Sequence, residues 1–543
     1  MPQYARDYHR VDWLHNIDPI KDRYSGGRGF KDSTGTIFTL RGLMNIGSLV
    51  LLAAALLMLF AGYPILTYFF KEAESNKGGF NLGGTNGTGQ LFTGVRGLVD
   101  PDTPAEALTR MSLDGQRRMQ LVFSDEFEED GRSFYPGDDP FWTAVDLHYW
   151  GTGDYEWYEP AGVTTANGRM VFTLIEQPTH NLNFRSGMVQ SWNQFCFTGG
   201  FIEVSLRLPG SHDIAGLWPA AWTMGNLGRA GHGATTDGLW PYTYDACDVG
   251  TLPNQTYPAS RGGGPVAAET SGAFPDQYGP SLSYLPGQRL SRCTCPGEDH
   301  PGPFHSDGSY VGRAAPEIDI IEASAGVRPG SAGHVSMSCQ LAPFNNALNL
   351  TTGRDAVVFY GSNRTENELN AYQGAVYQQT ASVLVTTDND VYEDTGGRFE
   401  RYGFEYKPGY DADSHITWTV GDDMQWRLGS QALAADPAVE ISARPIPLEP
   451  MYIIMNLGLS SAFSYVDFDR LHFPARMEVD WVRVYQDEDK INVGCDPPDF
   501  PTKEYIERHY EAYHNPNLTT WTEPRARGGM NMQFPGNRLA GDC

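Results

Sequence analysis

Residues 316–323 read Pro-Glu-Ile-Asp-Ile-Ile-Glu-Ala and place three carboxylates in a run that is otherwise apolar. Side chains alternate between the two faces of a strand, so Glu317 and Asp319 share one face whereas Glu322 would point to the other. One extra residue, a β-bulge at 320–321, returns Glu322 to the face of the other two acids. The pattern therefore predicts a bulged strand with three acids on one side.

Such a set of carboxylates suits glycoside hydrolysis. In a retaining mechanism one carboxylate attacks the anomeric carbon and a carboxylic acid about 5–5.5 Å away protonates the leaving oxygen. Four strand steps of roughly 3.3 Å separate the outer two backbones by about 13 Å, so Glu317 and Glu322 must lean together. We expect Asp319 to lie between them and to help hold their pKa values apart. Solvated acids on an exposed strand, or a metal site, are the alternatives for this motif alone.

Tryptophans precede the acids in the chain. Trp218 and Trp222 lie in the segment 216–224, and Trp240 follows it. Indole rings offer flat, partly apolar faces that suit sugar rings. A single Trp in a β domain is more often part of the core, but several beside three acids favour a glycan cleft. His334 follows the acids and is a further candidate for substrate contact, with a structural role as the alternative.

The surrounding sequence has the period of an all-β domain. From about residue 119, short runs alternate apolar and polar residues, as in 201–208, 401–406 and 477–485, which is typical of half-buried strands. Residues 242–316 interrupt this pattern with Gly, Pro, Ser and three cysteines, and we interpret them as an insertion held by disulfides. The sequence predicts an antiparallel β-sandwich or jelly roll.

An apolar run lies near the N-terminus, because residues 42–70 carry no charged side chain. A membrane helix needs about 20 apolar residues. A cleaved signal peptide fits poorly, because 41 residues precede the run. The segment before it holds seven Lys/Arg and five Asp, which places that end in the cytosol by the positive-inside rule. The expected organisation is a cytosolic tail (1–42), a transmembrane signal anchor (43–70), a Gly-rich stem (71–118), the β domain (119–490) and a C-terminal tail (491–543).

All seven cysteines and all five Asn-x-Ser/Thr sequons lie after the apolar run. This joint segregation indicates an oxidising, glycosylating compartment for the C-terminal part. Seven is odd, so at least one thiol is free or pairs between chains, and a Cys495–Cys543 bridge is a guess. The candidate glycosylation sites are Asn86, Asn254, Asn349, Asn363 and Asn517.

Composition excludes two classes of protein. With 66 acidic and 39 basic residues the formal net charge is −27, which argues against a nucleic-acid partner because phosphate binding needs a basic surface. Aromatic residues make up 12% and charged residues 19%, too many rings and too few charges for a disordered chain.

Taken together, these motifs resemble glycoside hydrolase family 16 in its bulged form. Residues 317–322 resemble the active-site strand of that family, 218–222 its tryptophan motif and 449–456 one of its closing strands, within a likeness that covers roughly residues 119–487. The resemblance implies Glu317 as nucleophile, Glu322 as acid/base and Asp319 as helper.

The same resemblance implies no required cofactor. Family 16 members often bind a structural calcium, and Glu126 and Asp480 could supply ligands here. Simple hydrogen bonding by these two acids is the alternative. The insertion 242–316 departs from the family pattern and could roof part of the cleft.

A narrower resemblance covers the whole arrangement of tail, anchor, stem and domain. It is similar to the fungal β-glucan synthesis-associated membrane proteins, as are the insertion around Cys293 and Cys295 and the tail after Cys495. This implies a glucan-active glycosidase or transglycosylase in the making of wall β-1,6-glucan, with β-glucan or an oligosaccharide as substrate and wall-synthesis proteins as partners. Two alternatives remain: a non-catalytic glycan-binding or scaffold protein, and a glucosidase that trims N-glycans in the endoplasmic reticulum.

Overall fold

The computed structural model describes residues 40–63, 97–350, 356–361 and 365–543. These residues belong to two compact units, divided after Ser75. The first holds helix α2 (Leu40–Leu57), which continues into a π-helical turn over Met58–Gly62. Among the residues described, no helix is both long and apolar enough to cross a membrane. The anchor expected at 43–70 stays a prediction, and residues 64–70, the tail up to residue 39 and the stem from 71 to 96 lie outside the described ranges.

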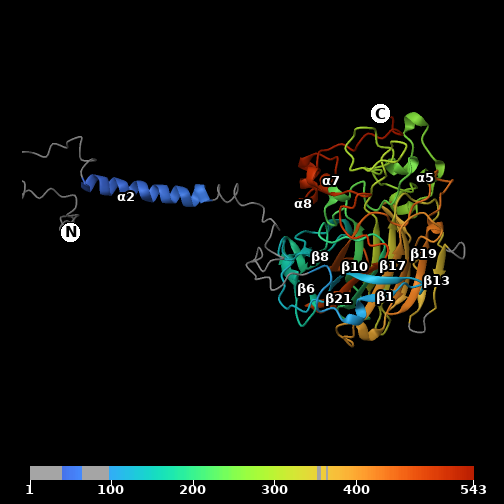
Figure 1. The fold of residues 1–543 in the computed structure, drawn as a ribbon, viewed down its shortest axis with the longest axis horizontal. Coiled ribbons are helices and arrows are strands. Elements are labelled where there is room, and N and C mark those ends of the chain that lie inside the picture. The colour runs from blue at the N-terminus through green and yellow to red at the C-terminus, as the bar shows by residue number, and fades with distance from the viewer. Residues whose placement is uncertain (1–39, 64–96, 351–355, 362–364) are drawn as a thin grey trace, which may run out of the picture. The chain divides into compact units, whose positions relative to one another are not determined.

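The second unit is a sandwich of two antiparallel sheets, so the predicted all-β fold is confirmed (Figure 1). The larger sheet runs in the order β13 (Val357–Phe359), β19 (Asp423–Gly429), β18 (His415–Val420), β17 (Glu400–Lys407), β9 (Gly200–Arg207), β21 (Ala475–Asp487), β6 (Met170–Thr179), β7 (Leu182–Ser186) and β4 (Glu156–Tyr158). Three further strands extend it: β2 (Arg118–Asp125) pairs with β21, β1 (Thr109–Met111) with β2, and β5 (Val163–Thr165) with β6.

The smaller sheet carries the acidic motif. Its order is β14 (Asn367–Leu369), β16 (Gln378–Thr386), β12 (His334–Leu341), β11 (Glu317–Ser324), β10 (Leu217–Gly225), β20 (Met451–Leu459), β8 (Met188–Gln190) and β3 (Thr143–Ala144), with β15 (Gly374–Ala375) paired to β16. Within the described residues, β4 and β7 form the one parallel pair among the named strands.

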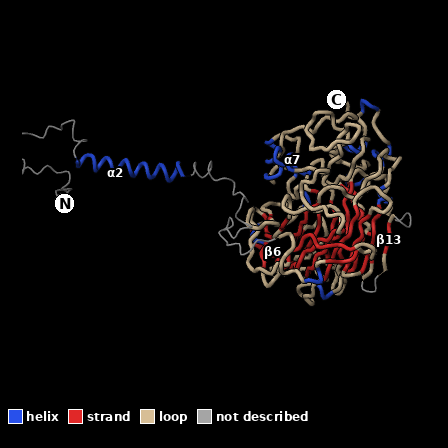
Figure 2. Tube along the Cα trace, viewed as in Figure 1, coloured by secondary structure: helices blue, strands red, loops and turns tan. Residues whose placement is uncertain are grey.

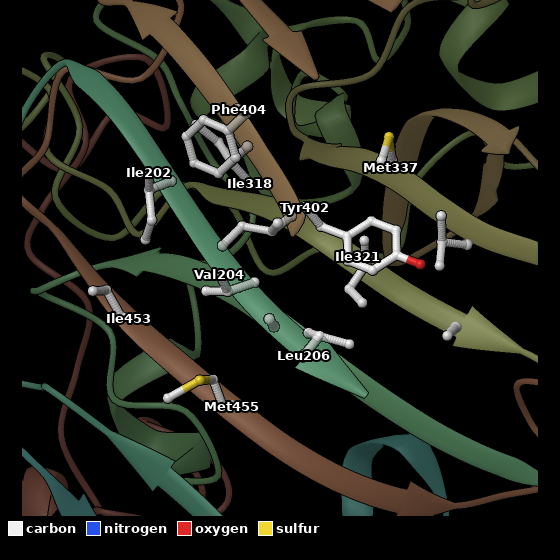
Figure 3. Packing of buried hydrophobic residues seen from close by; sticks show 14 of the residues in the cluster. Ile202, Val204, Leu206, Ile318, Ile321, Met337, Tyr402, Phe404, Ile453 and Met455 are labelled. Carbon is white, nitrogen blue, oxygen red and sulfur yellow. The ribbon is translucent and has the colours of Figure 1, made fainter. Parts of the chain in front are cut away.

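The core lies between the two sheets. Figure 3 shows Ile202, Val204 and Leu206 of β9 and Tyr402 and Phe404 of β17 packed with Ile318 and Ile321 of β11, Met337 of β12 and Ile453 and Met455 of β20. Period-two alternation explains this: one face of each strand supplies the apolar layer. The opposite face of the smaller sheet carries the acids and also a second set of apolar side chains, among them Tyr452 and Ile454.

Loops and short helices form a second layer over one end of the strands (Figure 2). We call residues 226–316 and 496–543 together the cap. Its apolar side chains, among them Leu239, Leu290, Tyr513 and Trp521, pack with Tyr452 of β20. The helices of the cap are α4 (Gly233–Thr236), α5 (Val266–Thr270), α6 (Pro275–Tyr278), α7 (Lys503–Arg508) and α8 (Tyr510–His514). Single 3-10 turns lie at 105–107, 150–152, 160–162, 249–251, 253–255, 259–261, 389–391, 430–433 and 525–527.

Two disulfides hold the cap to itself, and a third joins the sandwich to Cys495, the residue just before the C-terminal part of the cap. Cys247 pairs with Cys293, Cys295 with Cys543, and Cys196 with Cys495. The guessed Cys495–Cys543 bridge is therefore wrong, because each of these residues faces a cysteine from a distant part of the chain. Cys339 is the free thiol and lies buried in the sandwich core.

The β-structure begins before the boundary expected at residue 119. Strand β1 pairs with β2, and the Asp100 backbone N–H donates to the Ser124 hydroxyl at 2.8 Å. Asp100 is buried. The described part of the expected stem, from residue 97, therefore packs on the sandwich rather than leading up to it.

The packing predicts how much the free energy of unfolding falls when a cavity is made behind the acids. Ile318 is fully buried between the sheets, so Ile318→Ala should lower the free energy of unfolding by about 2–5 kcal/mol. Urea unfolding followed by tryptophan fluorescence measures this. Val327→Ala, at a side chain that is 58% exposed, is the control and should change it by less than about 0.5 kcal/mol. Equal losses in the two variants would contradict the described core.

Candidate active site

The bulge predicted in the acidic strand is confirmed. On β12, Ser338 pairs with Asp319 and Ser336 with Glu322, so residues 320–321 of β11 face a single residue of the partner strand. Ile320 and Ile321 are both fully buried and belong to the sandwich core. The extra residue lets two successive apolar side chains point into the core, and Glu322 returns to the face that carries Asp319.

Hydrogen bonds place the acids on one face. The Ser338 hydroxyl lies 2.7 Å from Asp319 Oδ2 and 3.4 Å from Glu322 Oε2. Gln340 Nε2 donates to the same Asp319 oxygen at 3.0 Å. Asp319 is 1% exposed, and Glu317, two residues earlier on β11, shares its face of the sheet. The three carboxyl groups therefore form one cluster over the smaller sheet.

Two of the predicted sugar platforms donate to the outer acids. Trp218 Nε1 donates to Glu322 Oε1 at 3.1 Å, and Trp240 Nε1 donates to Glu317 Oε2. Trp222 Nε1 instead donates to Asn456 Oδ1 at 2.9 Å, on the neighbouring strand β20. All three indoles thus lie around the cluster. Their N–H groups make these contacts, whereas the sequence predicted contacts through the ring faces.

One face of Trp218 is already covered. The Phe463 ring stacks on it with centroids 4.2 Å apart and planes 2° from parallel. Trp222 is 8% exposed, so little of its ring is open. Trp240 and Trp218 are half-buried.

Burial raises the pKa of every acid in the cluster, and repulsion between carboxylates raises it further for Glu317 and Glu322. The pKa of Glu317 lies well above its usual value, first because of burial and then because of the charges of Asp319 and Glu322. Burial raises the pKa of Asp319 to about 6, although the hydrogen bonds from Ser338 and Gln340 lower it. Burial and then the charge of Asp319 raise the pKa of Glu322 to about 8. Three carboxyls this close cannot all ionise near neutral pH, so the site holds both a proton donor and an acceptor.

A shared proton accounts for an oxygen that otherwise lacks a partner. Asp319 Oδ1 is buried and accepts no hydrogen bond from a donor group of the described residues. The Glu317 carboxyl lies within hydrogen-bonding reach of Asp319. A proton held between these two groups satisfies Oδ1 and removes one negative charge from the cluster.

His334 lies on the site face but away from the acids. It begins β12 and pairs with Ser324 and Thr386. Burial lowers the pKa of His334, and the negative charge of Glu368 partly offsets this effect. His334 lies two positions before Ser336, which pairs with Glu322, so it sits one same-face step beyond the Glu322 end of the cluster.

The pair proposed for calcium does not form an oxygen cage. Arg483 donates to both oxygens of Glu126, at 2.9 and 2.7 Å, and the Thr103 hydroxyl donates to Oε1 at 2.8 Å. Asp480 accepts from Ser205 at 3.4 Å. Within the described ranges, no three His, Cys, Asp or Glu side chains gather as a metal site would require. Both oxygens of Glu126 are already bonded to a guanidinium, so these residues do not fit calcium.

The described sequons lie on the surface. Asn254, Asn349 and Asn517 are exposed, as an acceptor of a bulky glycan must be. Asn86 and Asn363 lie outside the described residues.

Several residues of the site were not predicted. Ser338 and Gln340 hold Asp319, and burial together with the charge of Glu317 raises the pKa of Tyr149. A signal for the first two was present, because polar residues alternate with Val335, Met337, Cys339 and Leu341 along β12. Tyr149 comes from a loop, where no period in the sequence places it.

Known proteins match this chain over its whole length. The family model described as "Beta-glucan synthesis-associated protein SKN1/KRE6/Sbg1" matches residues 1–543. The chain belongs to this family. The protein KRE6 of Saccharomyces cerevisiae is 41% identical over 535 residues, covering 98% of this chain and 68% of the relative. SKN1 of Candida albicans is also 41% identical over 535 residues, covering 98% and 66%.

The chain thus spans about two thirds of these family members. The endo-1,3-1,4-beta-glycanase ExsH of Rhizobium meliloti is 27% identical over 177 residues, covering 28% of this chain and 35% of that protein. Among solved structures, the laminarinase catalytic domain of Thermotoga petrophila is 16% identical, with a TM-score of 0.38, covering 68% of this chain and 99% of that one. The endo-beta-1,3-glucanase of Pyrococcus furiosus is 17% identical, with a TM-score of 0.38, covering 71% and 98%.

The raised pKa of Glu322 predicts a pH-dependent effect on stability. Its folded-state pKa lies above the ordinary value, so the folded state binds the extra proton, and the stability this acid contributes is lost as pH rises from about 4.5 to about 8. Glu322→Gln removes that loss. The melting temperature of the variant should equal that of the wild type near pH 4 and exceed it by an amount that grows toward pH 8.

Glu298→Gln, at an exposed glutamate of the cap, is the matched control. Its melting temperature should differ from that of the wild type by the same amount at every pH between about 4 and about 8. Differential scanning fluorimetry of both variants measures it. A stabilisation by Glu322→Gln that shrinks as the pH rises would rule out the described burial of this carboxyl.

Proposed function

We propose that this protein is a membrane-anchored, glucan-active enzyme that forms or rearranges β-1,6-glucan in the fungal wall through a retaining mechanism. Membership of a family of beta-glucan synthesis-associated proteins supports glucan as the substrate class. The observation that carries the catalytic part is the cluster of Glu317, Asp319 and Glu322 on one face of a bulged strand.

Each acid has one task in the proposed reaction. Ionised Glu317 attacks the anomeric carbon, and the glycosidic C–O bond breaks as an ester bond to Glu317 forms. Glu322, with its pKa near 8, is protonated at neutral pH and gives its proton to the leaving oxygen. As Glu317 attacks, the proton that it shares with Asp319 moves fully onto Asp319, so the attacking oxygen of Glu317 carries the negative charge. In the second step Glu322 removes a proton from the acceptor, whose oxygen displaces the ester.

The acceptor decides whether the outcome is hydrolysis or transfer. Water gives hydrolysis and a sugar hydroxyl gives a transglycosylase. The cap packs over the Glu317 end of the sheet, and Trp240 of the cap contacts Glu317. Such cover limits the access of water and favours a sugar acceptor. The proposal is therefore transfer, with hydrolysis as the slower reaction.

The proposed location follows from the disulfides and the apolar run. Three disulfides require an oxidising compartment. With a signal anchor at 43–70 this makes a single-pass type II membrane protein of the secretory pathway, in the endoplasmic reticulum, Golgi or plasma membrane. Its sandwich then faces the lumen or the cell exterior, where wall-synthesis proteins are the proposed partners.

Covalent trapping tests the mechanism. A 2-deoxy-2-fluoro glucosyl donor with a dinitrophenolate leaving group needs no acid for departure, so it should label both wild type and Glu322→Gln. Peptide mass spectrometry should locate the ester on Glu317, and Glu317→Gln should stay unlabelled. With Glu322→Gln, added azide should speed release of the sugar as the β-azide, because azide needs no general base. Labelling that persists in Glu317→Gln would refute the assignment of the nucleophile.

The non-catalytic alternative makes a different prediction in cells. A glycan-binding or scaffold protein does not need Glu322 as an acid, so Glu322→Gln should then support normal β-1,6-glucan in the wall. The catalytic proposal predicts loss of that polymer at normal protein abundance. Trimming of N-glycans would instead alter glycoproteins throughout the cell. Wall glucan analysis and glycoprotein mobility, measured together, separate the three.

A further inference from the structure

Trp240 contacts the proposed nucleophile from outside the sheet. Its Nε1 donates to Glu317 Oε2, and its backbone follows α4 in the cap rather than a strand. The backbone N–H of Ala315, two residues before Glu317, donates to the Leu239 carbonyl at 3.0 Å. The position of the indole therefore depends on whatever fixes residues 233–240.

Arg289 fixes this segment through its carbonyl groups. Its guanidinium donates to the carbonyls of Ala234 at 3.0 Å, Thr235 at 3.1 Å and Asp237 at 2.5 Å. Its backbone N–H donates to the Gly238 carbonyl at 2.7 Å. These carbonyls lie at the C-terminal end of α4, where the helix itself offers them no donor. The guanidinium thus binds three carbonyls, and the Arg289 backbone N–H a fourth, within residues 234–238 just before Trp240.

The C-terminal tail holds Arg289 in turn. The guanidinium carbon lies 3.8 Å from the centre of the Trp521 ring, and both residues are 1% exposed. The Trp521 backbone N–H donates to Asp237 Oδ2 at 2.8 Å, and the Ala234 N–H donates to the Leu518 carbonyl at 2.9 Å. A buried cation stacked on an indole is favourable because the ring face is electron-rich.

We propose that Arg289 and Trp521 are positioning residues of the active site, holding residues 234–240 so that the Trp240 indole stays bonded to Glu317. This inference rests on the proposed function, since it assigns a task to the cap in that reaction. It makes the C-terminal tail a working part of the site through its contacts with Arg289 and with residues 234–237.

The chemistry of the contact explains why arginine is needed. A planar guanidinium offers five donors in a fixed fork, so it can serve several carbonyls and stack on a ring at once. A lysine ammonium is a compact point charge that cannot reproduce this geometry. An indole N–H that donates to Glu317 stabilises the ionised form, which is the form that attacks. A shifted indole leaves less of Glu317 ionised at a given pH.

The experiment compares Arg289→Lys, Trp240→Phe and their double variant in the full-length protein. With the activated donor, each single variant should lower the rate of ester formation by about tenfold, with little change in the donor concentration needed for half the maximal rate. The acidic limb of the pH–rate profile should move up by about one pH unit in both. The double variant should be no slower than Trp240→Phe alone, because the two act through one contact.

Controls separate positioning from folding and from failure of the proposed function. Arg292→Lys changes a second arginine of the cap, which bonds Asp307 at the surface, and should leave the rate and profile unchanged. Trp521→Phe keeps a ring and tests the tail if Arg289→Lys fails to fold. An unchanged profile in Arg289→Lys, or additive losses in the double variant, would overturn the inference. Full labelling of Glu317→Gln would overturn the proposed function instead.

Discussion

Repulsion among three buried carboxyl groups is the constraint around which the site is built. Burial disfavours the charged form of each acid, and the charge of Asp319 adds to this effect at both Glu317 and Glu322. The protein meets this cost with donors on every side: Trp240 for Glu317, Ser338 and Gln340 for Asp319, and Trp218 for Glu322. The bulge at 320–321 is what brings the third acid into this field.

The acidic strand could be read from the sequence because its information is local. Period-two alternation and one extra residue suffice to place Glu317, Asp319 and Glu322 on one face. Contacts between distant segments could not be read this way. The bond from Trp240 to Glu317 spans 77 residues, and the packing of Trp521 on Arg289 depends on how the tail folds over the cap. No local pattern in the sequence indicates either of these two contacts.

The missed disulfide pairing and the missed ion pair of Glu126 have the same origin. The bridge expected between Cys495 and Cys543 assumed that the tail closes on itself, whereas Cys196 and Cys295 supply the partners from the sandwich and the insertion. The calcium pair assumed that Glu126 was free to bind an ion, whereas Arg483 occupies both of its oxygens. In each case a residue far along the chain satisfied a group that looked available in the sequence.

The stack of Phe463 on Trp218 sets a limit on how tightly a sugar can be held there. An aromatic pair of this kind contributes about 0.5–1.5 kcal/mol beyond the area it buries, and the two rings are nearly parallel at 4.2 Å. A sugar that uses this face must displace the phenyl ring, so it exchanges one stacking partner for another and gains little net free energy. In the proposed reaction, weak retention at this position would let the product leave quickly.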